Sequence, residues 1–197
     1  NGSITSAAHP PNSNATGISI VGDVAAIATI EDGVQQTSPV WGLNATTGAE
    51  LWRDDFSNLV DSTDTPREAP NALLPFASNP DGGAALPTAY GNTLILKFDT
   101  LLGGVNARNG GKVWSRGLTD GTYQFTGNSL AVAGDSVFVT SYTTIDRIDL
   151  RTKIPTWQFY AQAANNDFTG VQGIIVANGI VYTRDFIGVV FAFAAMD

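Results

Sequence analysis

A phrase that repeats along the chain limits its fold more than any other feature. The first copy is Val40–Trp52, VWGLNATTGAELW, and the second is Val105–Trp114, VNARNGGKVW. A weaker third copy is Ile148–Trp157, and a fourth, Val190–Ala195, begins in the same way and is cut off by the end of the chain. In the first three copies an Asn or Asp precedes the Trp by eight positions. Repeats of this kind predict a repeat architecture before any single residue predicts a function.

A short hairpin is predicted upstream of each copy. Four segments match there, and their central dipeptides are Gly22-Asp23, Gly91-Asn92, Gly134-Asp135 and Asn178-Gly179. Such dipeptides favour two-residue turns because they tolerate positive φ. A second hairpin is predicted at Asn44–Gly48, since Asn bonds its own backbone two residues on and Gly takes the left-handed position. Two hairpins in each repeat predict a four-stranded antiparallel sheet.

The spacing of the repeats predicts a β-propeller. Asn44, Asn106, Asp149 and Ala194 occupy the same place in the four copies and are 62, 43 and 45 residues apart. A blade of about 40 to 45 residues explains the last two intervals. The first interval is longer because of an insertion at residues 57–83, rich in Asp, Pro and Asn, with a short helical turn expected at Glu68–Leu74.

We therefore expect an all-β fold of about four blades, the last one incomplete. The expected divisions are a polar tail at residues 1–14 and a propeller segment at 15–197, with blades at 15–56, 84–116, 127–160 and 170–197.

Composition limits the partners. Charged residues make up 14% of the chain and the net charge is −8, which argues against nucleic acid and anionic membranes. The apolar stretch Gly188–Met196 is far shorter than the roughly 18 residues of a membrane span. There is no cysteine. Candidate N-glycosylation sites at Asn1, Asn14 and Asn44 suggest an extracellular or secreted protein, periplasmic if the source is bacterial.

The repeat resembles that of pyrroloquinoline-quinone-dependent (quinoprotein) alcohol dehydrogenases and their non-enzymatic relatives. That family's unit reads roughly Leu-Tyr-Ala-Leu-Asp-Ala-x-Thr-Gly-x-x-Leu-Trp after two strands. In the first copy the matching positions are Val40, Trp41, Gly42, Leu43, Asn44, Ala45, Thr47, Gly48, Leu51 and Trp52. The second copy keeps Asn106, Ala107, Gly110 and Trp114, and the third keeps Asp149, Thr152 and Trp157 but has Lys153 in place of the Gly.

The resemblance implies structural roles for most of these residues. In the family, the outer-strand Trp docks between blades and covers the next blade's turn, which implies that role for Trp52, Trp114 and Trp157. The alternative is stacking on a sugar or a quinone ring. Trp41 stands where the family has Tyr, and we expect it in the core. The residues expected to build the turns are Gly48, Gly110, Asn44, Asn106 and Asp149.

Family enzymes complete a ring, typically of eight blades, and bind pyrroloquinoline quinone with a calcium ion held by Glu, Asn and Asp. The methanol-type enzymes also have a disulfide between adjacent cysteines, which this chain lacks. With about four blades, we expect no cofactor in the isolated chain. Calcium and the quinone are expected only if the full assembly is an enzyme.

Other candidate chemistry is weaker. Acidic clusters at Asp54-Asp55, Asp61 with Asp64, and Asn165-Asn166-Asp167 lack EF-hand spacing and are interpreted as solvated turns. His9, the only histidine, lies in the polar tail and is a poor candidate for a catalytic triad. The Gly pairs at 82–83, 103–104 and 110–111 are expected to be turns or bulges rather than phosphate-binding loops.

An incomplete last blade leaves sheet edges and blade faces open for another chain. Three completions are open: the segment Ser3–Ser19 supplies a strand, two copies form an eight-bladed ring, or the chain is part of a longer propeller. The expected function is a secreted, non-catalytic binding or scaffold module with residues 57–83 as its recognition loop. The alternatives are part of a quinone-dependent alcohol or sugar dehydrogenase, and carbohydrate binding through Tyr123, Tyr142 or Tyr160.

Overall fold

The computed structural model describes residues 13–31, 39–54, 87–98, 101–117, 130–140, 144–160, 171–185 and 188–195, in strands and turns. The chain divides into two compact units, residues 1–117 and 118–197, and each is described by itself. The strands of the first unit are β1 (Ser13–Val21), β2 (Val24–Glu31), β3 (Val40–Asn44), β4 (Glu50–Asp54), β5 (Thr88–Tyr90), β6 (Thr93–Phe98), β7 (Leu101–Asn106) and β8 (Lys112–Gly117). Those of the second are β9 (Leu130–Ala133), β10 (Ser136–Thr140), β11 (Thr144–Asp149), β12 (Pro155–Tyr160), β13 (Val171–Ala177), β14 (Ile180–Asp185) and β15 (Val190–Ala194).

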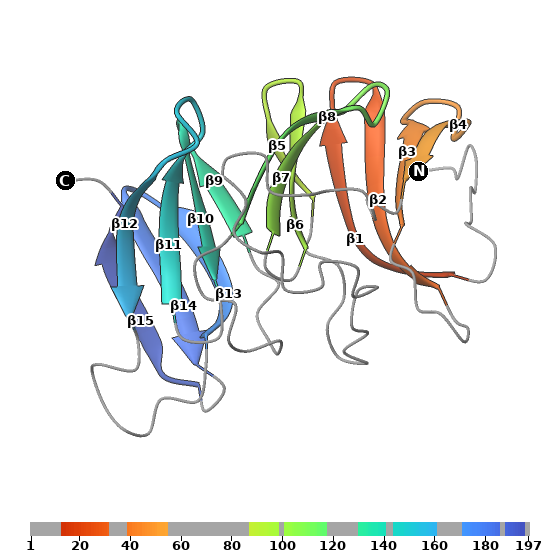
Figure 1. Cartoon of the computed structure of the whole chain (residues 1–197). Coiled ribbons are helices and arrows are strands. Elements are labelled where there is room, and N and C mark those ends of the chain that lie inside the picture. Colours follow the sequence, from red (N-terminus) through yellow and green to blue (C-terminus); the bar gives the residue numbers. More distant parts are fainter. Residues whose placement is uncertain are drawn as a thin grey trace. The chain divides into compact units, whose positions relative to one another are not determined.

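The strands form four antiparallel sheets, each an up-and-down meander (Figure 1). Blade A is β1–β4, blade B is β5–β8, blade C is β9–β12, and blade D is β13–β15, with three strands among the described residues. The expected all-β propeller of about four blades, the last one incomplete, is confirmed. No helix in the described part of the chain is long and apolar enough to cross a membrane.

The hairpin inside each blade follows from its turn dipeptide. Gly22, Gly91 and Gly134 have φ between 55° and 59°, as the first residue of a type II′ turn requires. In blade D both Asn178 (φ 52°) and Gly179 (φ 74°) lie in the left-handed region, as in a type I′ turn. These turns match the right-handed twist of paired strands, and the register is therefore fixed locally.

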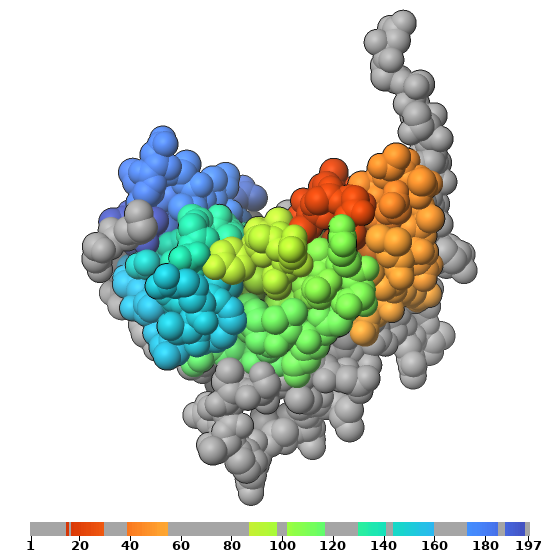
Figure 2. All heavy atoms as spheres, turned by 90° about the horizontal axis from the view of Figure 1, so that it is seen from above, coloured from red at the N-terminus to blue at the C-terminus, as the bar shows by residue number. Residues whose placement is uncertain are grey.

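In the first unit, the core lies between blades A and B. Val21, Ala26, Val40 and Trp52 of blade A form one cluster with Leu94, Leu96, Val105 and Ala107 of blade B. All eight side chains are 8% exposed or less. Figure 2 shows blade A, in red and orange, lying against blade B, in green. Burial of these apolar faces is the main force that holds the two sheets together.

In the second unit, blades C and D pack in the same way. Phe138 and Ile145 of blade C contact Ile174, Val181 and Ala195 of blade D. Trp157, Phe159 and Phe193 pack around this cluster, with ring centroids 5.9 Å apart for Trp157 and Phe193 and 4.3 Å apart for Phe159 and Phe193. Aromatic contacts at these distances add to the stability gained from burial.

Two expectations are corrected. Gly103 and Gly104 lie inside β7 and not between two strands, although the register shift between Gly104 and Val105 fits the expected bulge. Within the segment Ser3–Ser19, residues 13–19 do not complete another blade, because they pair with β2 inside blade A.

Several expected features lie outside the described residues. They are the insertion at 57–83 with its helical turn at Glu68–Leu74, His9, Asn1, Asp55, Asp61, Asp64, the Asn165–Asp167 cluster, and Tyr123 and Tyr142. The side chain of Tyr160 lies outside them too.

Candidate functional site

The turns that follow the anchor residues share one hydrogen-bond pattern. Asn44 Oδ1 accepts the backbone N–H groups of Thr46 (3.0 Å) and Thr47 (2.8 Å). Asn106 Oδ1 accepts the N–H of Arg108 at 2.9 Å. Asp149 Oδ1 accepts those of Arg151 and Thr152, both at 2.8 Å. In each turn the anchor oxygen thus satisfies backbone donors that the hairpin leaves unpaired.

The fifth residue of each turn has a left-handed backbone. Gly48 (φ 72°), Gly110 (φ 68°) and Lys153 (φ 64°) all donate their N–H to the carbonyl of the anchor, at 2.7 to 2.9 Å. Lys153 pays a steric cost there because it has a Cβ. Burial lowers the pKa of Lys153, and the nearby Asp149 carboxylate partly offsets this by raising it.

The Asp149 carboxylate is held in its ionised form. The backbone N–H of Thr152 donates to it and lowers its pKa below 3.8, with smaller contributions in the same direction from the N–H of Arg151, the Thr152 hydroxyl and the Arg151 charge. Desolvation acts in the opposite direction but is outweighed. The perturbed pKa therefore reflects turn formation.

Trp52 joins blade A to the turn of blade B. Its Nε1 donates a buried hydrogen bond of 2.7 Å to the carbonyl oxygen of Ala107. A Cβ added to Gly110 would lie 2.8 Å from Trp52 Cε3, so the indole needs a glycine beneath it. A Cβ on Gly42, directly across the sheet, would overlap the same indole.

The other two tryptophans of the repeat differ in their surroundings. Trp114 lies opposite Gly104, where a Cβ would overlap its indole, as at Gly42. Trp157 faces Arg147 instead of a glycine, and it stacks on Phe159 with a centroid distance of 6.3 Å and an angle of 15°. With Arg147 in place of a glycine across the sheet, Trp157 is less buried than the other two tryptophans. Trp52 and Trp114 are 8% exposed, whereas Trp157 is half-buried.

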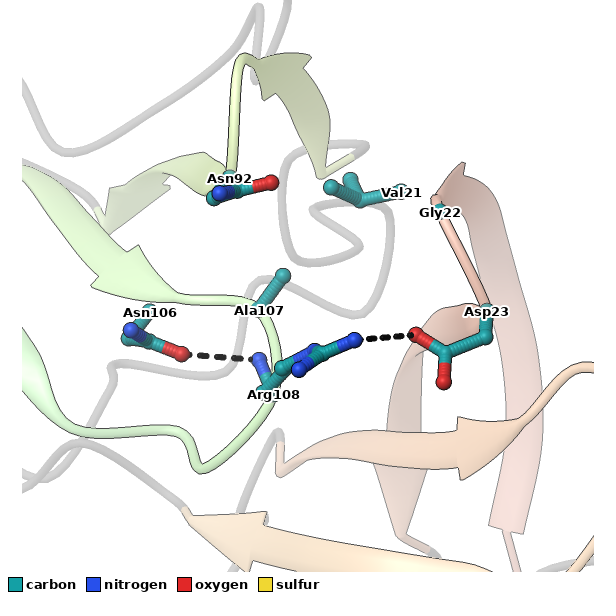
Figure 3. A pocket seen from close by; sticks show the side chains of 7 residues that line it. All are labelled: Val21, Gly22, Asp23, Asn92, Asn106, Ala107 and Arg108. Atoms are coloured by element: carbon teal, nitrogen blue, oxygen red, sulfur yellow. Dashed lines mark hydrogen bonds and ion pairs between the residues drawn. The ribbon is translucent and has the colours of Figure 1, made fainter.

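A pocket of about 280 Å³ opens where the turns of blades A and B meet (Figure 3). It is lined by Val21, Gly22, Asp23, Asn92, Asn106, Ala107 and Arg108. The Arg108 side chain points toward Asp23, and its Nη2 lies 3.7 Å from Asp23 Oδ1. Both side chains are more than half exposed, so this ion pair contributes little to stability. The pocket is therefore a notch between two turns that contains an exposed ion pair.

The second unit has an equivalent ion pair within one blade. Arg151, two residues after its anchor like Arg108, lies with its Nε 3.5 Å from Asp135 Oδ2. Asp135 belongs to the hairpin of the same blade. Blade B has Asn92 at that place, and its arginine reaches the aspartate of blade A instead. Where blade C has Asp135 and an ion pair within the blade, blade B has Asn92 and an ion pair from Arg108 to blade A.

The chemistry of the notch does not suit calcium. Its oxygen donors include one carboxylate, Asp23, and the amides of Asn92 and Asn106, while calcium takes six to eight oxygens. The guanidinium of Arg108 lies among these donors and supplies positive charge where a cation would need to bind. No group of three or more metal-binding side chains occurs in the described ranges.

Sequence reasoning missed two features. One is the notch, whose only local signal was the Gly22-Asp23 turn. The other is the polar environment of Trp41: the side chain is buried as expected, at 6% exposed, but the guanidinium of Arg53 lies 4.5 Å from its ring centroid and its Nε1 has no hydrogen-bond partner. The candidate glycosylation site Asn44 is half-buried and ends β3, whereas Asn14 lies within β1.

Comparison with known proteins agrees with this architecture. The sequence model of a family described as outer membrane protein assembly factor BamB matches residues 22–197. No curated protein sequence matches the chain.

Solved structures with a similar fold include two natural proteins and one designed protein. BamB from Moraxella catarrhalis is 18% identical with a TM-score of 0.58, and the match covers 91% of this chain and 46% of that one. The computationally designed Ika4 protein is 14% identical with a TM-score of 0.64, covering 98% and 99%. The quinohemoprotein alcohol dehydrogenase ADHIIG from Pseudomonas putida HK5 is 14% identical with a TM-score of 0.58, covering 90% and 32%.

These identities show a common fold and nothing more specific. The chain spans less than half the length of the BamB structure that it matches. The family match, by contrast, extends over nearly the whole chain and includes every repeat described above. The chain therefore belongs to the family of outer membrane protein assembly factor BamB, a family of quinoprotein-like β-propeller repeats.

Proposed function

We propose that the chain is a non-catalytic binding or scaffold module that forms one part of a larger propeller ring. The observation that carries this proposal is the match of residues 22–197 to a family described as an assembly factor. The hydrogen bonds of the anchors support it, because the side-chain oxygens of Asn44, Asn106 and Asp149 are engaged by backbone N–H groups of their own turns. Polar groups used in this way build the turns.

The lengths of the structural neighbours support the larger ring. The chain aligns with 46% of the M. catarrhalis BamB structure and with 32% of the P. putida dehydrogenase. Both of these chains are thus two to three times as long as this one. In this proposal, further blades beside the four described here complete the ring.

We place the recognition surface in the insertion at residues 57–83. It is rich in Asp, Pro and Asn, and long loops on rigid scaffolds commonly carry function. The chain and a variant without residues 57–83 can be compared by affinity capture from extracts of the source cells. Proteins captured by the full chain should be lost from the variant. Equal capture by both would contradict this role.

An extracellular or periplasmic location is proposed with this function. The family's description as an outer membrane protein assembly factor supports it. Glycosylation of Asn1, Asn14 or Asn44 stays a prediction, and so does carbohydrate binding through Tyr123, Tyr142 or Tyr160.

The alternative function, part of a quinone-dependent dehydrogenase, rests on similarity of fold. Titration of the chain with pyrroloquinoline quinone and calcium, followed by absorbance and calorimetry, separates the two functions. We expect no saturable binding, because the notch holds a guanidinium among its few oxygen donors. Stoichiometric, calcium-dependent quinone binding with alcohol-dependent dye reduction would overturn the scaffold proposal.

A further inference from the structure

The backbone around the notch between blades A and B is fixed by hydrogen bonds. The Asp23 carbonyl accepts the N–H of Ala45 at 2.8 Å, and the Asn92 carbonyl accepts the N–H of Ala107 at 3.0 Å. The carbonyl of Ala107 in turn accepts the buried hydrogen bond of 2.7 Å from Trp52 Nε1. The two blades therefore hold the lining residues in place, and the notch is preformed.

The polar side chains of the notch keep hydrogen-bonding capacity. Arg108 Nη2 and Asp23 Oδ1 are 3.7 Å apart, and the two side chains are 80% and 59% exposed. A charge-assisted hydrogen bond is about 2.7–2.9 Å long, so this contact saturates neither group. Among the described residues, the Asn92 side chain has no hydrogen-bond or ion-pair partner. Donors of Arg108, acceptors of Asp23 and both kinds on Asn92 thus border one space (Figure 3).

Two apolar side chains line the same space. Val21, at the end of β1, is 8% exposed, and Ala107 is 2% exposed. Gly22 adds no side chain between Val21 and Asp23, and a Cβ there would have open space around it. The volume of about 280 Å³ lies slightly below the range of about 300–1,000 Å³ for pockets that hold drug-sized ligands. The notch therefore suits a molecule of one ring.

The repeat does not require these polar residues. At the positions of Asn92 and Asn106, blade D has Gly179 and Ala194, which bring no polar side chain. The backbone bond from Ala107 to Asn92 is still matched in blade D by one from Ala195 to Gly179 at 2.7 Å. The same turns thus form without an amide at this place, so the Asn92 side chain has no structural role in its turn.

The charges of the notch select the class of ligand. An anion would be repelled by Asp23 and by the net charge of −8, and a cation would be repelled by Arg108. An apolar ligand would remove water from these polar groups without replacing its hydrogen bonds. A hydroxyl group donates one hydrogen bond and accepts two, so it can bind a carboxylate and a neighbouring guanidinium together. Neutral molecules with several hydroxyl groups fit best.

We propose that the notch binds a neutral sugar ring. Hydroxyl groups of the sugar donate to the Asp23 carboxylate and accept from Arg108 and Asn92, while a C–H face of the ring packs on Val21 and Ala107. The site lies entirely within the first compact unit and is distinct from the tyrosines considered above. This inference goes beyond the proposed function, because a scaffold for proteins does not need a sugar site.

The test is a titration of the full chain with glucose, galactose and mannose, followed by saturation-transfer difference and two-dimensional amide NMR. An exposed site that makes a few hydrogen bonds should bind at least one of these sugars with a Kd on the order of 1 mM. The amide signals of Gly22, Asp23, Asn92 and Arg108 should shift in a saturable way. Glycine, a zwitterion, and glucuronate, an anionic ring, should not displace the sugar.

Two variants and one matched control locate the site. Asn92→Ala and Asp23→Ala each remove hydrogen bonds to the ligand and should weaken the affinity at least about 10-fold. Arg151→Ala is the control, because Arg151 forms the equivalent ion pair of 3.5 Å within blade C, outside the notch, and it should leave the affinity unchanged. All three side chains are exposed, so the far-UV circular dichroism of each variant should match that of the wild type.

Three outcomes would overturn the inference. Absence of saturable shifts with all three sugars would exclude the site. Sugar binding that survives both Asn92→Ala and Asp23→Ala would place it elsewhere on the chain. Displacement of the sugar by glycine or glucuronate would show that the notch selects a charged ligand. None of these results bears on the scaffold function, which is tested separately by protein capture with and without residues 57–83.

Discussion

The free energy contributed by the hydrogen bond from Trp52 of blade A to Ala107 of blade B can be measured by comparing two variants, Trp52→Phe and Trp41→Phe. The two tryptophans are 8% and 6% exposed, so each substitution removes the same atoms from a similarly buried site. Trp52 Nε1 donates to the Ala107 carbonyl at 2.7 Å, while Trp41 Nε1 has no partner. The pair therefore differs chiefly in the hydrogen bond.

The expected losses follow from this difference. Shrinking a buried Trp to Phe costs about 1–2 kcal/mol through lost contacts and the residual cavity. Trp52→Phe also loses a buried hydrogen bond, which adds about 1–3 kcal/mol. Trp41→Phe keeps an aromatic face beneath Arg53 and removes an unsatisfied donor, so it should cost no more than the packing loss.

The measurement is urea unfolding at equilibrium, followed by far-UV circular dichroism because fluorescence would change with the tryptophan content. We expect Trp52→Phe to lower the free energy of unfolding by about 1–3 kcal/mol more than Trp41→Phe. Losses that agree to within about 0.5 kcal/mol would refute the assignment of an energetic role to the Trp52–Ala107 bond.

Three further predictions concern the turns. Gly110→Ala should destabilise the protein by about 2–4 kcal/mol in thermal unfolding, and the control Gly22→Ala by about 1 kcal/mol. Both glycines have positive φ, but only a Cβ at Gly110 would contact Trp52. Equal losses for the two variants would contradict this contact. Lys153→Gly should stabilise the protein by about 0.5–1 kcal/mol in urea titrations, because it relieves the left-handed strain at φ 64°; a loss would show that the lysine side chain outweighs that strain. The lowered pKa of Asp149 means that its contribution to stability is present above the ordinary value of 3.8 and is lost as the pH falls through the lower folded-state value. Asp149→Asn keeps the acceptor oxygen without the titration, so stability measured from pH 6 to pH 2 should fall less steeply for the variant, and parallel curves would contradict the assignment.

Local chemistry made the fold class predictable. The Gly-Asp, Gly-Asn and Asn-Gly turns need positive φ, and the Asn or Asp that opens each second turn accepts from the backbone N–H two residues on, and for Asn44 and Asp149 also from the one three residues on. Such interactions span a few residues and are therefore visible in the sequence. The sequence pattern placed Gly103-Gly104 between strands, but the pair lies inside β7, where Trp114 of the next strand occupies the space that a Cβ on Gly104 would need.

By itself, then, the sequence determined the number and kind of sheets and the places where the chain turns, because those depend on residues a few positions apart. Only the tertiary structure decided which Asp meets Arg108, that Ala107 accepts the bond from Trp52, and that Trp41 has a buried donor without an acceptor. Equivalent repeat positions have the same local chemistry, but their contacts depend on the side chains that a neighbouring sheet brings to them.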